Sequence, residues 1–454
     1  LGDTTKALND YNTAISLNRF EPEGYIRRSR IYVLQNETEK ALQDLDQAVK
    51  IDSTNAFAYF NRSIVRYNAK DIMGALSDLE RVLREDPGNA LTLYNRALIR
   101  SQIGDYNNAL EDYDRVLSIN PNNVLAYYNR ATLFVQLGRY RDAMDDYSQA
   151  INLYPDFANA YINRSYVKNQ LGQFNSAKSD YDIAQKKIRE YKSRVGDTTL
   201  ASSLADTTKK FDRLLALDAD FAKRDFNNEL LQYRDVDIRL KPLFKFRAAP
   251  EARMLMALEN RFDYPEMEQF RRSLPIPVEL STSQPLIDAK TLEQMRRVTD
   301  DKLKERTEAT ALFTKALIEA GSKQFNTALD CYNRAIGLEP EETFYYINRG
   351  ALQSEMIDFI SSIESNVQVL TLDNTSATRA KVQDQATRSY DYTPAIHDMK
   401  KAADLSPDFP YIYYNLGNLY CMSSDIPESI VQYTKAIELY PGFGEAYYNR
   451  GLVL

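Results

Sequence analysis

Apolar and polar positions recur along this chain with one fixed period, the spacing that separates Ala41 from Ala75. A series of small residues marks the period, and a series of asparagines and a series of arginines keep the same spacing. A period of this length is typical of stacked supersecondary units. Repeats are therefore expected to begin at positions 22, 56, 90, 124 and 158, after a partial repeat over residues 1–20. The residues that set the phase are Ala41, Ala75, Ala109, Ala143 and Ala177, with Asn61, Asn95, Asn129 and Asn163, and with Arg28, Arg62, Arg96, Arg130 and Arg164.

The unit over residues 124–157 shows what one repeat contains. Helical periodicity runs over residues 125–136 and again over 141–153. Gly138 suits the turn between the two stretches, and Pro155 ends the second one. Such a helix pair cannot hide its apolar face alone, so each pair must stack on the next. The pattern predicts a mostly all-α fold, an α-solenoid of helix pairs.

The same pattern returns from about residue 309 and continues to residue 454. Pro340 and Pro407 lie almost two periods apart instead of one, which indicates an insertion over about 358–390 within one repeat. Both ends of the sequence fall inside a repeat, and no polar capping unit is evident. We expect either a longer array or ends that dock on something else.

Residues 192–308 do not follow the repeat, and they divide the chain into an array over 1–191 and an array over 309–454. Apolar and charged residues alternate over 235–246, which predicts a half-buried strand, and 275–281 predicts a second strand. Two strands alone are marginal in water, so we expect a short β-hairpin that packs on the flanking helices, making this an α+β insert. A long helix is expected over 291–320. The insert is either the source of protein-specific function or a structural bend between arrays.

Composition excludes several classes of partner. The net charge is −7, with 57 basic and 64 acidic residues mixed along the chain. Without a basic patch, neither a nucleic acid nor an anionic membrane surface is expected as the main partner. No apolar run is long enough to cross a bilayer, so no span is expected in this segment. Two cysteines cannot form a disulfide framework, and they leave both the cytoplasm and a bacterial periplasm open.

The sequence contains no recognisable arrangement of catalytic or metal-binding residues. His397 is the single histidine, and it has neither neighbouring zinc ligands nor a nucleophile in a recognisable motif. No phosphate-binding loop or dinucleotide fingerprint occurs. We therefore expect no catalytic residues, no metal site and no cofactor, and the chain is not expected to be an enzyme.

The small–aromatic–small spacing and the recurring Tyr-x-Asn-Arg, as at Tyr59 to Arg62, resemble the tetratricopeptide repeat family in its bacterial form. The resemblance implies that the first helix of each pair lines a concave groove. It also favours a bacterial periplasm or cell envelope over the cytoplasm. On that basis, the residues expected to bind a partner segment are Asn61, Asn95, Asn129, Asn163, Phe60, Tyr94, Tyr128, Asn348, Asn415 and Asn449.

Asparagine suits this groove because its amide donates and accepts at once, so it can bind a peptide backbone without reading side chains. Such asparagine ladders are known in the tetratricopeptide superhelix of the O-linked N-acetylglucosamine transferase. The alternative is that each asparagine only ties one helix to the next. A second ladder, of Arg62, Arg96, Arg130 and Arg164 with the aspartates at 78, 112, 146 and 180, is expected to fix the stacking of neighbouring units.

Three functions remain open. The leading hypothesis is a non-enzymatic scaffold that binds a segment of a protein or peptide partner, with bacterial cell-envelope assembly or secretion as the setting that the resemblance favours. The alternative is the regulatory or targeting arm of an enzyme whose catalytic domain lies outside this segment. A third is a structural member of a larger complex, with the inserts as docking points.

Overall fold

The computed structural model describes residues 3–194, 240–249, 262–283, 287–305, 308–366, 370–371, 381–382 and 390–454. The expected polar stretch after residue 194 and the first part of the strand expected over 235–246 lie outside the described residues. The chain divides into two compact units, one formed by residues 1–19 with 239–454 and the other by residues 20–238. The repeat phase divides the sequence into arrays, whereas these two units follow packing.

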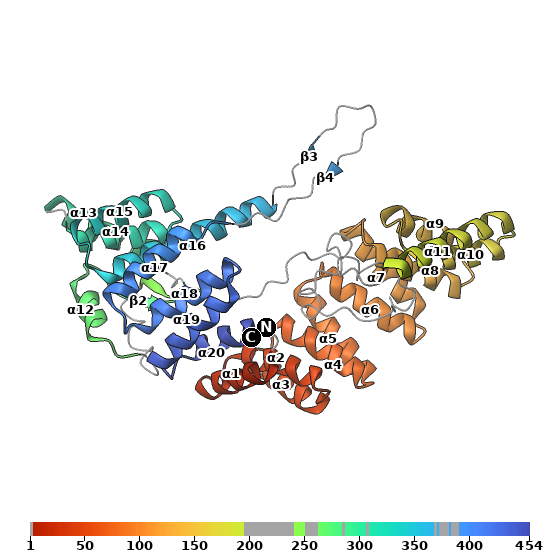
Figure 1. Cartoon of the computed structure of the whole chain (residues 1–454), viewed down its shortest axis with the longest axis horizontal. Coiled ribbons are helices and arrows are strands. Elements are labelled where there is room, and N and C mark those ends of the chain that lie inside the picture. The colour runs from red at the N-terminus through yellow and green to blue at the C-terminus, as the bar shows by residue number, and fades with distance from the viewer. Residues whose placement is uncertain are drawn as a thin grey trace. The chain divides into compact units, whose positions relative to one another are not determined.

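The unit that begins at residue 20 is a run of helix pairs, drawn from red to yellow in Figure 1. The two helices of each pair pack antiparallel, and each pair packs on the next. Both expected stretches of the unit over 124–157 are helical. The helices are α2 (Pro22–Leu34), α3 (Thr38–Ile51), α4 (Ala56–Asn68), α5 (Ile72–Glu85), α6 (Ala90–Gln102), α7 (Tyr106–Ile119), α8 (Val124–Gln136), α9 (Tyr140–Leu153), α10 (Ala158–Gln170) and α11 (Phe174–Arg194).

Local sequence sets the ends of these helices. The side chains of Asn55, Asn89 and Asn123 each accept a hydrogen bond from the backbone N–H three residues later, which caps the first helix of a pair. The turn between paired helices needs one residue with positive φ. Gly138 supplies it at +70° at no steric cost, whereas Lys70 adopts +69° at the same repeat position.

Small residues allow the paired helices to approach closely. Ala75, Ala109 and Ala143 are fully buried at one position of the second helix. Large tyrosine rings fill the space beside them: Tyr94 packs edge-on against Tyr113 with 6.0 Å between ring centroids. Each pair thus buries its apolar face only with its neighbours present.

The arginine–aspartate ladder forms, but its geometry corrects the expectation. Arg62 donates two hydrogen bonds to Asp78, at 2.9 and 2.7 Å, and both residues belong to the same repeat. The ladder therefore ties the two helices of one pair together, because each arginine and its aspartate lie on facing helices of that pair. Contact with the preceding repeat comes instead from a different aspartate, Asp46, at 2.8 Å from the same arginine.

The other unit contains the second array and the described part of the insert. Its elements are α1 (Thr4–Leu17), β1 (Lys245–Ala248), α12 (Pro265–Ser273), β2 (Val278–Ser281), α13 (Ala289–Glu305), α14 (Ala309–Gly321), α15 (Phe325–Leu338), α16 (Thr343–Asn366), β3 (Leu370–Thr371), β4 (Lys381–Val382), α17 (Thr393–Leu405), α18 (Pro410–Met422), α19 (Ile426–Leu439) and α20 (Gly444–Val453).

The insert contributes a two-stranded antiparallel sheet, β1 with β2, in which Phe246 lies opposite Leu280. The two strands pair, but within the described residues the first begins only at Lys245, near the end of the range expected for it, and α12 lies between the strands in the sequence. The single helix expected over 291–320 was wrong, because the chain there forms α13 and α14. The two helices have different environments: α14 is buried along most of its length as the first helix of a repeat, whereas α13 is largely exposed.

The repeat interrupted over about 358–390 is visible in its helices. Its first helix, α16, has 24 residues, whereas α14 and α18 have 13 each. The second helix, α17, does not begin until Thr393. Between them the described residues include the small antiparallel pair β3 and β4.

Helices α20 and α1 pack together as the two helices of one repeat. Arg450 donates to both carboxylate oxygens of Asp10, at 2.9 and 2.7 Å, in the geometry of Arg62 with Asp78. The backbone N–H of Asp3 donates to the carbonyl of Leu454 at 3.1 Å. The two partial repeats of the sequence therefore complete each other within this unit.

The two aspartates that share Arg62 allow a matched test of the ladder. Asp78→Asn should lower the free energy of unfolding by about 2–4 kcal/mol, because Asp78 is 3% exposed and its loss leaves Arg62 and Arg66 without their buried anion. Asp46→Asn should cost less than about 1 kcal/mol, because Asp46 is 58% exposed. Urea denaturation followed by circular dichroism measures both. Equal losses would show that the ladder does not hold the pairs.

Candidate functional site

The described part of the insert begins with an extended segment, residues 240–248, that lies along the first helices of the second array. We call it the groove segment. Asn348, Asn415 and Asn449, which occupy one repeat position on α16, α18 and α20, each contact its backbone. The segment runs from Asn449 towards Asn348, opposite to the order of the repeats.

Each of these asparagines uses both ends of its amide. The N–H of Phe246 donates to Oδ1 of Asn348 at 3.0 Å, and Nδ2 of Asn348 donates back to the carbonyl of Phe246 at 2.9 Å. Asn415 holds Phe244 in the same way, at 2.8 and 2.7 Å. The two bonds imitate a neighbouring strand, so recognition depends on the backbone and not on the side chain.

Asn449 repeats the arrangement at Lys241, where it accepts from the N–H at 2.8 Å and donates to the carbonyl at 3.1 Å. The same carbonyl also accepts from Nδ2 of Asn418 at 2.8 Å and from the hydroxyl of Tyr414 at 2.7 Å. The next residue, Pro242, has no N–H, and its carbonyl accepts from Tyr414 at 3.2 Å. Proline is tolerated here because the neighbouring groove side chains donate hydrogen bonds to backbone carbonyls. The N–H that proline lacks is therefore not needed at this position.

Aromatic side chains of the array receive the two phenylalanines of the segment. Around Phe244 lie Tyr411, Tyr414 and Phe443, with ring centroids 4.7–5.6 Å away. Phe246 is fully buried and contacts Phe344 at 5.3 Å. Ring contacts of this kind contribute about 0.5–1.5 kcal/mol each beyond area burial. The asparagines set the register of the groove segment along the helices, and the aromatic pockets hold its two phenylalanines in that register.

Two basic side chains of the segment share one carboxylate. Lys245 forms an ion pair with Glu355 of α16, and Arg247 donates to the same carboxylate at 3.0 Å. Burial lowers the pKa of Lys245 from 10.5 to about 8. Burial alone would raise the pKa of Glu355, but Lys245 and Arg247 outweigh it and lower that pKa. Glu355 therefore stays ionised at neutral pH and balances part of the charge of the segment.

The segment is also held on its opposite edge. Lys245 to Ala248 form β1, which pairs with β2, while the amide groups of Phe246 turn to Asn348. In an extended strand, alternate residues direct their N–H and C=O groups to opposite sides. Residues 245–248 are thus fixed between the asparagine ladder and β2. Residues 240–244 precede β1, and their described hydrogen bonds go to the ladder and to Tyr414 and Asn418 of α18.

In the first array the asparagines occupy the same position of their helices. Asn129 donates to the hydroxyl of Tyr94 at 2.6 Å, and Asn163 donates to that of Tyr128 at 3.0 Å. Asn449 makes the equivalent bond to Tyr414 at 3.0 Å, while it also binds the groove segment. Tying helices and binding a backbone are therefore compatible roles for one asparagine.

The remaining members of the first ladder are also placed. Asn95 is fully buried, and Nδ2 of Asn61 donates to the carbonyl of Phe57 at 2.8 Å. Phe60 and Tyr94 are buried beside them. The repeat brings these residues into one series along α4, α6, α8 and α10.

Sequence reasoning missed several contacts of the second groove. Asn418 and Glu355 carried no repeat signal, because the equivalent positions in other repeats hold other residue types. Tyr414 could have been found, since it occupies the position of Tyr94 and Tyr128. The alternating pattern over 235–246 indicated an extended segment but not its location in the groove.

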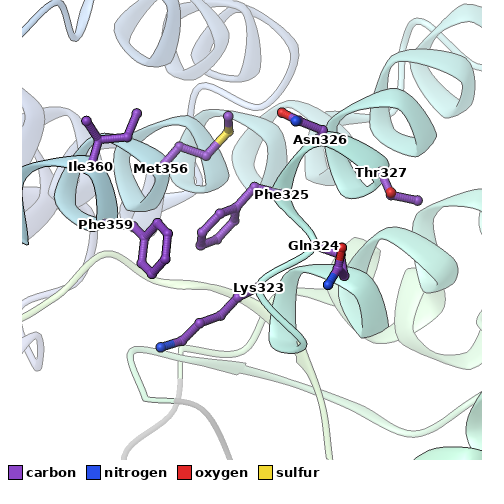
Figure 2. Close-up of a pocket in the computed structure, with 8 residues that line it drawn as sticks. All are labelled: Lys323, Gln324, Phe325, Asn326, Thr327, Met356, Phe359 and Ile360. Atoms are coloured by element: carbon purple, nitrogen blue, oxygen red, sulfur yellow. The ribbon is translucent and has the colours of Figure 1, made fainter. Parts of the chain in front are cut away.

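A separate cleft of about 260 Å³ lies between the turn that joins α14 to α15 and the far part of α16 (Figure 2). Phe325 and Phe359 face each other in it, with ring centroids 5.3 Å apart, beside Met356 and Ile360. Its described lining includes no carboxylate, histidine or thiol, and Lys323 is its charged member.

The histidine noted in the sequence, His397, has a side chain that is 79% exposed on α17. Within the described ranges, no group of three histidine, cysteine or carboxylate side chains is placed to hold a metal ion. A search of the same ranges for helices long and apolar enough to cross a membrane found none.

Comparison with known proteins gives matches to the repeats. Two sequence profiles described as tetratricopeptide repeat match residues 22–55, and residues 90–123 and 124–157. No curated protein matches the chain significantly. Similar solved structures include "Crystal structure of MamA", 18% identical, covering 37% of this chain and 96% of its own, with a TM-score of 0.35.

Two further structures are comparably similar. "Crystal structure of YrrB: a TPR protein with an unusual peptide-binding site" is 22% identical and covers 39% of this chain and 91% of its own, with a TM-score of 0.35. "MamA 41-end from Desulfovibrio magneticus RS-1" is 17% identical and covers 39% and 97%, also with a TM-score of 0.35.

The profile matches agree with what the coordinates show independently. Helix pairs recur with the period of the sequence, small residues are buried where the paired helices meet, and the first helices share one series of asparagines. On these grounds, the chain contains tetratricopeptide repeats, and the repeats over residues 22–55, 90–123 and 124–157 match the family directly.

Proposed function

We propose that this chain is a non-enzymatic protein-interaction scaffold whose first array holds an extended segment of a partner protein along Asn61, Asn95, Asn129 and Asn163. One observation carries the proposal: in the second array, asparagines at the same repeat position hold an extended backbone by paired hydrogen bonds. The chain thereby contains an example of the binding mode.

The second groove serves the chain itself. The groove segment buries Phe246 completely and pairs with β2 on its other edge, so releasing it would open part of the core of that unit. Removing a large core side chain from its site costs about 3–5 kcal/mol, which a competing partner would have to exceed. Partner binding by Asn348, Asn415 and Asn449 stays a prediction, and it requires release of this segment.

The first array has the same supporting contacts. The hydroxyls of Tyr94 and Tyr128 hold the amides of Asn129 and Asn163 at set orientations. A fixed amide loses little conformational entropy on binding, which favours affinity. Phe60 and Tyr94 lie buried beside the ladder, at the repeat position that Tyr414 occupies in the second array.

Binding to the first array can be tested with a pool of degenerate 12-residue peptides and the immobilised chain of residues 1–454. The wild type should retain peptides, and the double variant Asn129→Ala/Asn163→Ala should retain at least tenfold less, because two amide pairs are lost. Asn107→Ala, an exposed asparagine on α7, is the matched control.

Thermal melting checks that the variants are folded. Retention by the double variant equal to that of the wild type would refute a role for this ladder.

Asn415 allows a direct test of backbone recognition in the second array. Asn415→Ala should speed hydrogen exchange at the amide of Phe244 about tenfold, because the acceptor of that N–H is removed. Hydrogen exchange read by NMR measures it. Asn333→Ala, an exposed asparagine of α15, should leave that amide unchanged. Equal protection in Asn415→Ala would mean that the amide pair does not hold the segment.

The pKa of Lys245 reports whether the groove segment is docked. Lys245 should titrate near pH 8 in the folded chain, well below the ordinary 10.5, because burial disfavours its charged form. Between these two values the released segment would bind more protons than the docked one, so docking should become more favourable as pH rises through this window. NMR of isotope-labelled lysine side chains measures the pKa, and Lys245→Arg assigns the signal. A Lys245 signal that titrates above pH 10 would contradict the burial.

A further inference from the structure

Four first helices of the first array, α4, α6, α8 and α10, keep their charges away from the groove, whereas α2 carries Glu23, Arg27 and Arg30 at the matching positions. Helices α4, α6, α8 and α10 contain no acidic residue at all. Every basic side chain on them pairs with an aspartate of a second helix. The pairs are Arg62 with Asp78 and Asp46, Arg66 with Asp78, Arg96 and Arg100 with Asp112, Arg130 with Asp146 and Asp114, and Arg164 and Lys168 with Asp180.

The groove segment shows which helix positions reach the backbone or the side chains of a bound segment. On the first helices of the second array, the contacting residues lie four residues before, one before, three after and seven after a ladder asparagine. In the second array these positions are represented by Tyr411, Tyr414, Asn418 and Glu355. Because the repeats share one geometry, the same positions mark the groove of the first array.

Together with the asparagines, these positions form a set of twenty on α4, α6, α8 and α10. None is charged, although 27% of the whole chain is charged. We call this set the neutral groove. Its residues are Phe57, Phe60, Asn61, Ile64 and Asn68 of α4, Leu91, Tyr94, Asn95, Leu98 and Gln102 of α6, Leu125, Tyr128, Asn129, Thr132 and Gln136 of α8, and Asn159, Ile162, Asn163, Tyr166 and Gln170 of α10.

The position seven residues after the asparagine differs between α16 and the helices α4, α6, α8 and α10. On α16 it holds Glu355, which pairs with Lys245 and Arg247 of the groove segment, and on α18 it holds Met422. On α4, α6, α8 and α10 it holds Asn68, Gln102, Gln136 and Gln170. The second groove therefore carries, on α16, the counter-charge for a basic segment, and these four helices carry an uncharged amide at that position.

We propose that the neutral groove selects an extended partner segment that carries no charged side chains over the four repeats, rich instead in serine, threonine, asparagine, glutamine, glycine and apolar residues. This inference rests on the proposed function and names its partner class. A charged side chain placed in this groove would lose hydration without meeting an opposite charge, which is unfavourable. Amides and hydroxyls can satisfy neutral polar side chains, and the ladder binds any backbone.

The experiment uses the chain of residues 1–454 and a degenerate 12-residue pool in which lysine, arginine, aspartate and glutamate make up a quarter of the input. Peptides retained by the wild type are sequenced by mass spectrometry, at 50 mM and at 500 mM NaCl. Peptides whose retention depends on Asn129 and Asn163 should contain at least fivefold fewer charged residues than the input. Their retention should change less than twofold with salt, because no ion pair contributes.

A gain-of-charge variant provides the matched control. Gln136→Glu/Gln170→Glu replaces two exposed amides of the neutral groove with carboxylates and leaves the ladder intact. This variant should enrich lysine and arginine in the retained peptides at 50 mM NaCl, and the enrichment should fall at 500 mM NaCl.

The outcomes separate the two proposals. Retention that depends on Asn129 and Asn163 but shows the charge content of the input supports the scaffold and overturns the neutral groove. Depletion of charge in the wild type, reversed by the two glutamates, supports both. Retention that ignores the ladder overturns the proposed function and, with it, this inference.

Discussion

Every feature of this protein depends on amphipathic helix pairs that bury their apolar faces only against neighbouring pairs. Buried alanines such as Ala109 and Ala143 let the two helices of a pair approach, and tyrosine rings fill the remaining space. Because the contacts recur once in every repeat, each first helix takes the same orientation as the one before it. Residues of one type that recur at one repeat position therefore form a continuous row along one face of the array.

The arginine–aspartate pairs have a second consequence beyond holding the helices of a pair together. Arg96 and Arg100 both reach Asp112, which is 1% exposed, so their charges are neutralised between the helices. The other face of the same helices is left to aromatic, aliphatic and amide side chains. An interaction that stabilises the repeat thereby also determines the electrostatic character of the groove.

The groove segment shows how the same scaffold is specialised in its second array. An extended backbone presents N–H and C=O groups that must be satisfied when they are buried. The asparagine ladder satisfies one edge of the segment and β2 satisfies the other, so Phe246 can be buried completely. Glu355 adds the opposite charge for two basic side chains. The insert thus supplies the second array with its own ligand.

The sequence by itself determined the repeat, its helix boundaries and the asparagine series, because these follow from local periodicity, capping residues and helix-breaking residues. It also indicated an extended stretch ending near Phe246. Only the tertiary structure decided that this stretch lies in the groove of the second array, that Arg62 pairs within its own repeat, and that α20 and α1 form one pair. These contacts join residues far apart in the chain or on facing helices. Their partners are selected by packing, which no local pattern encodes.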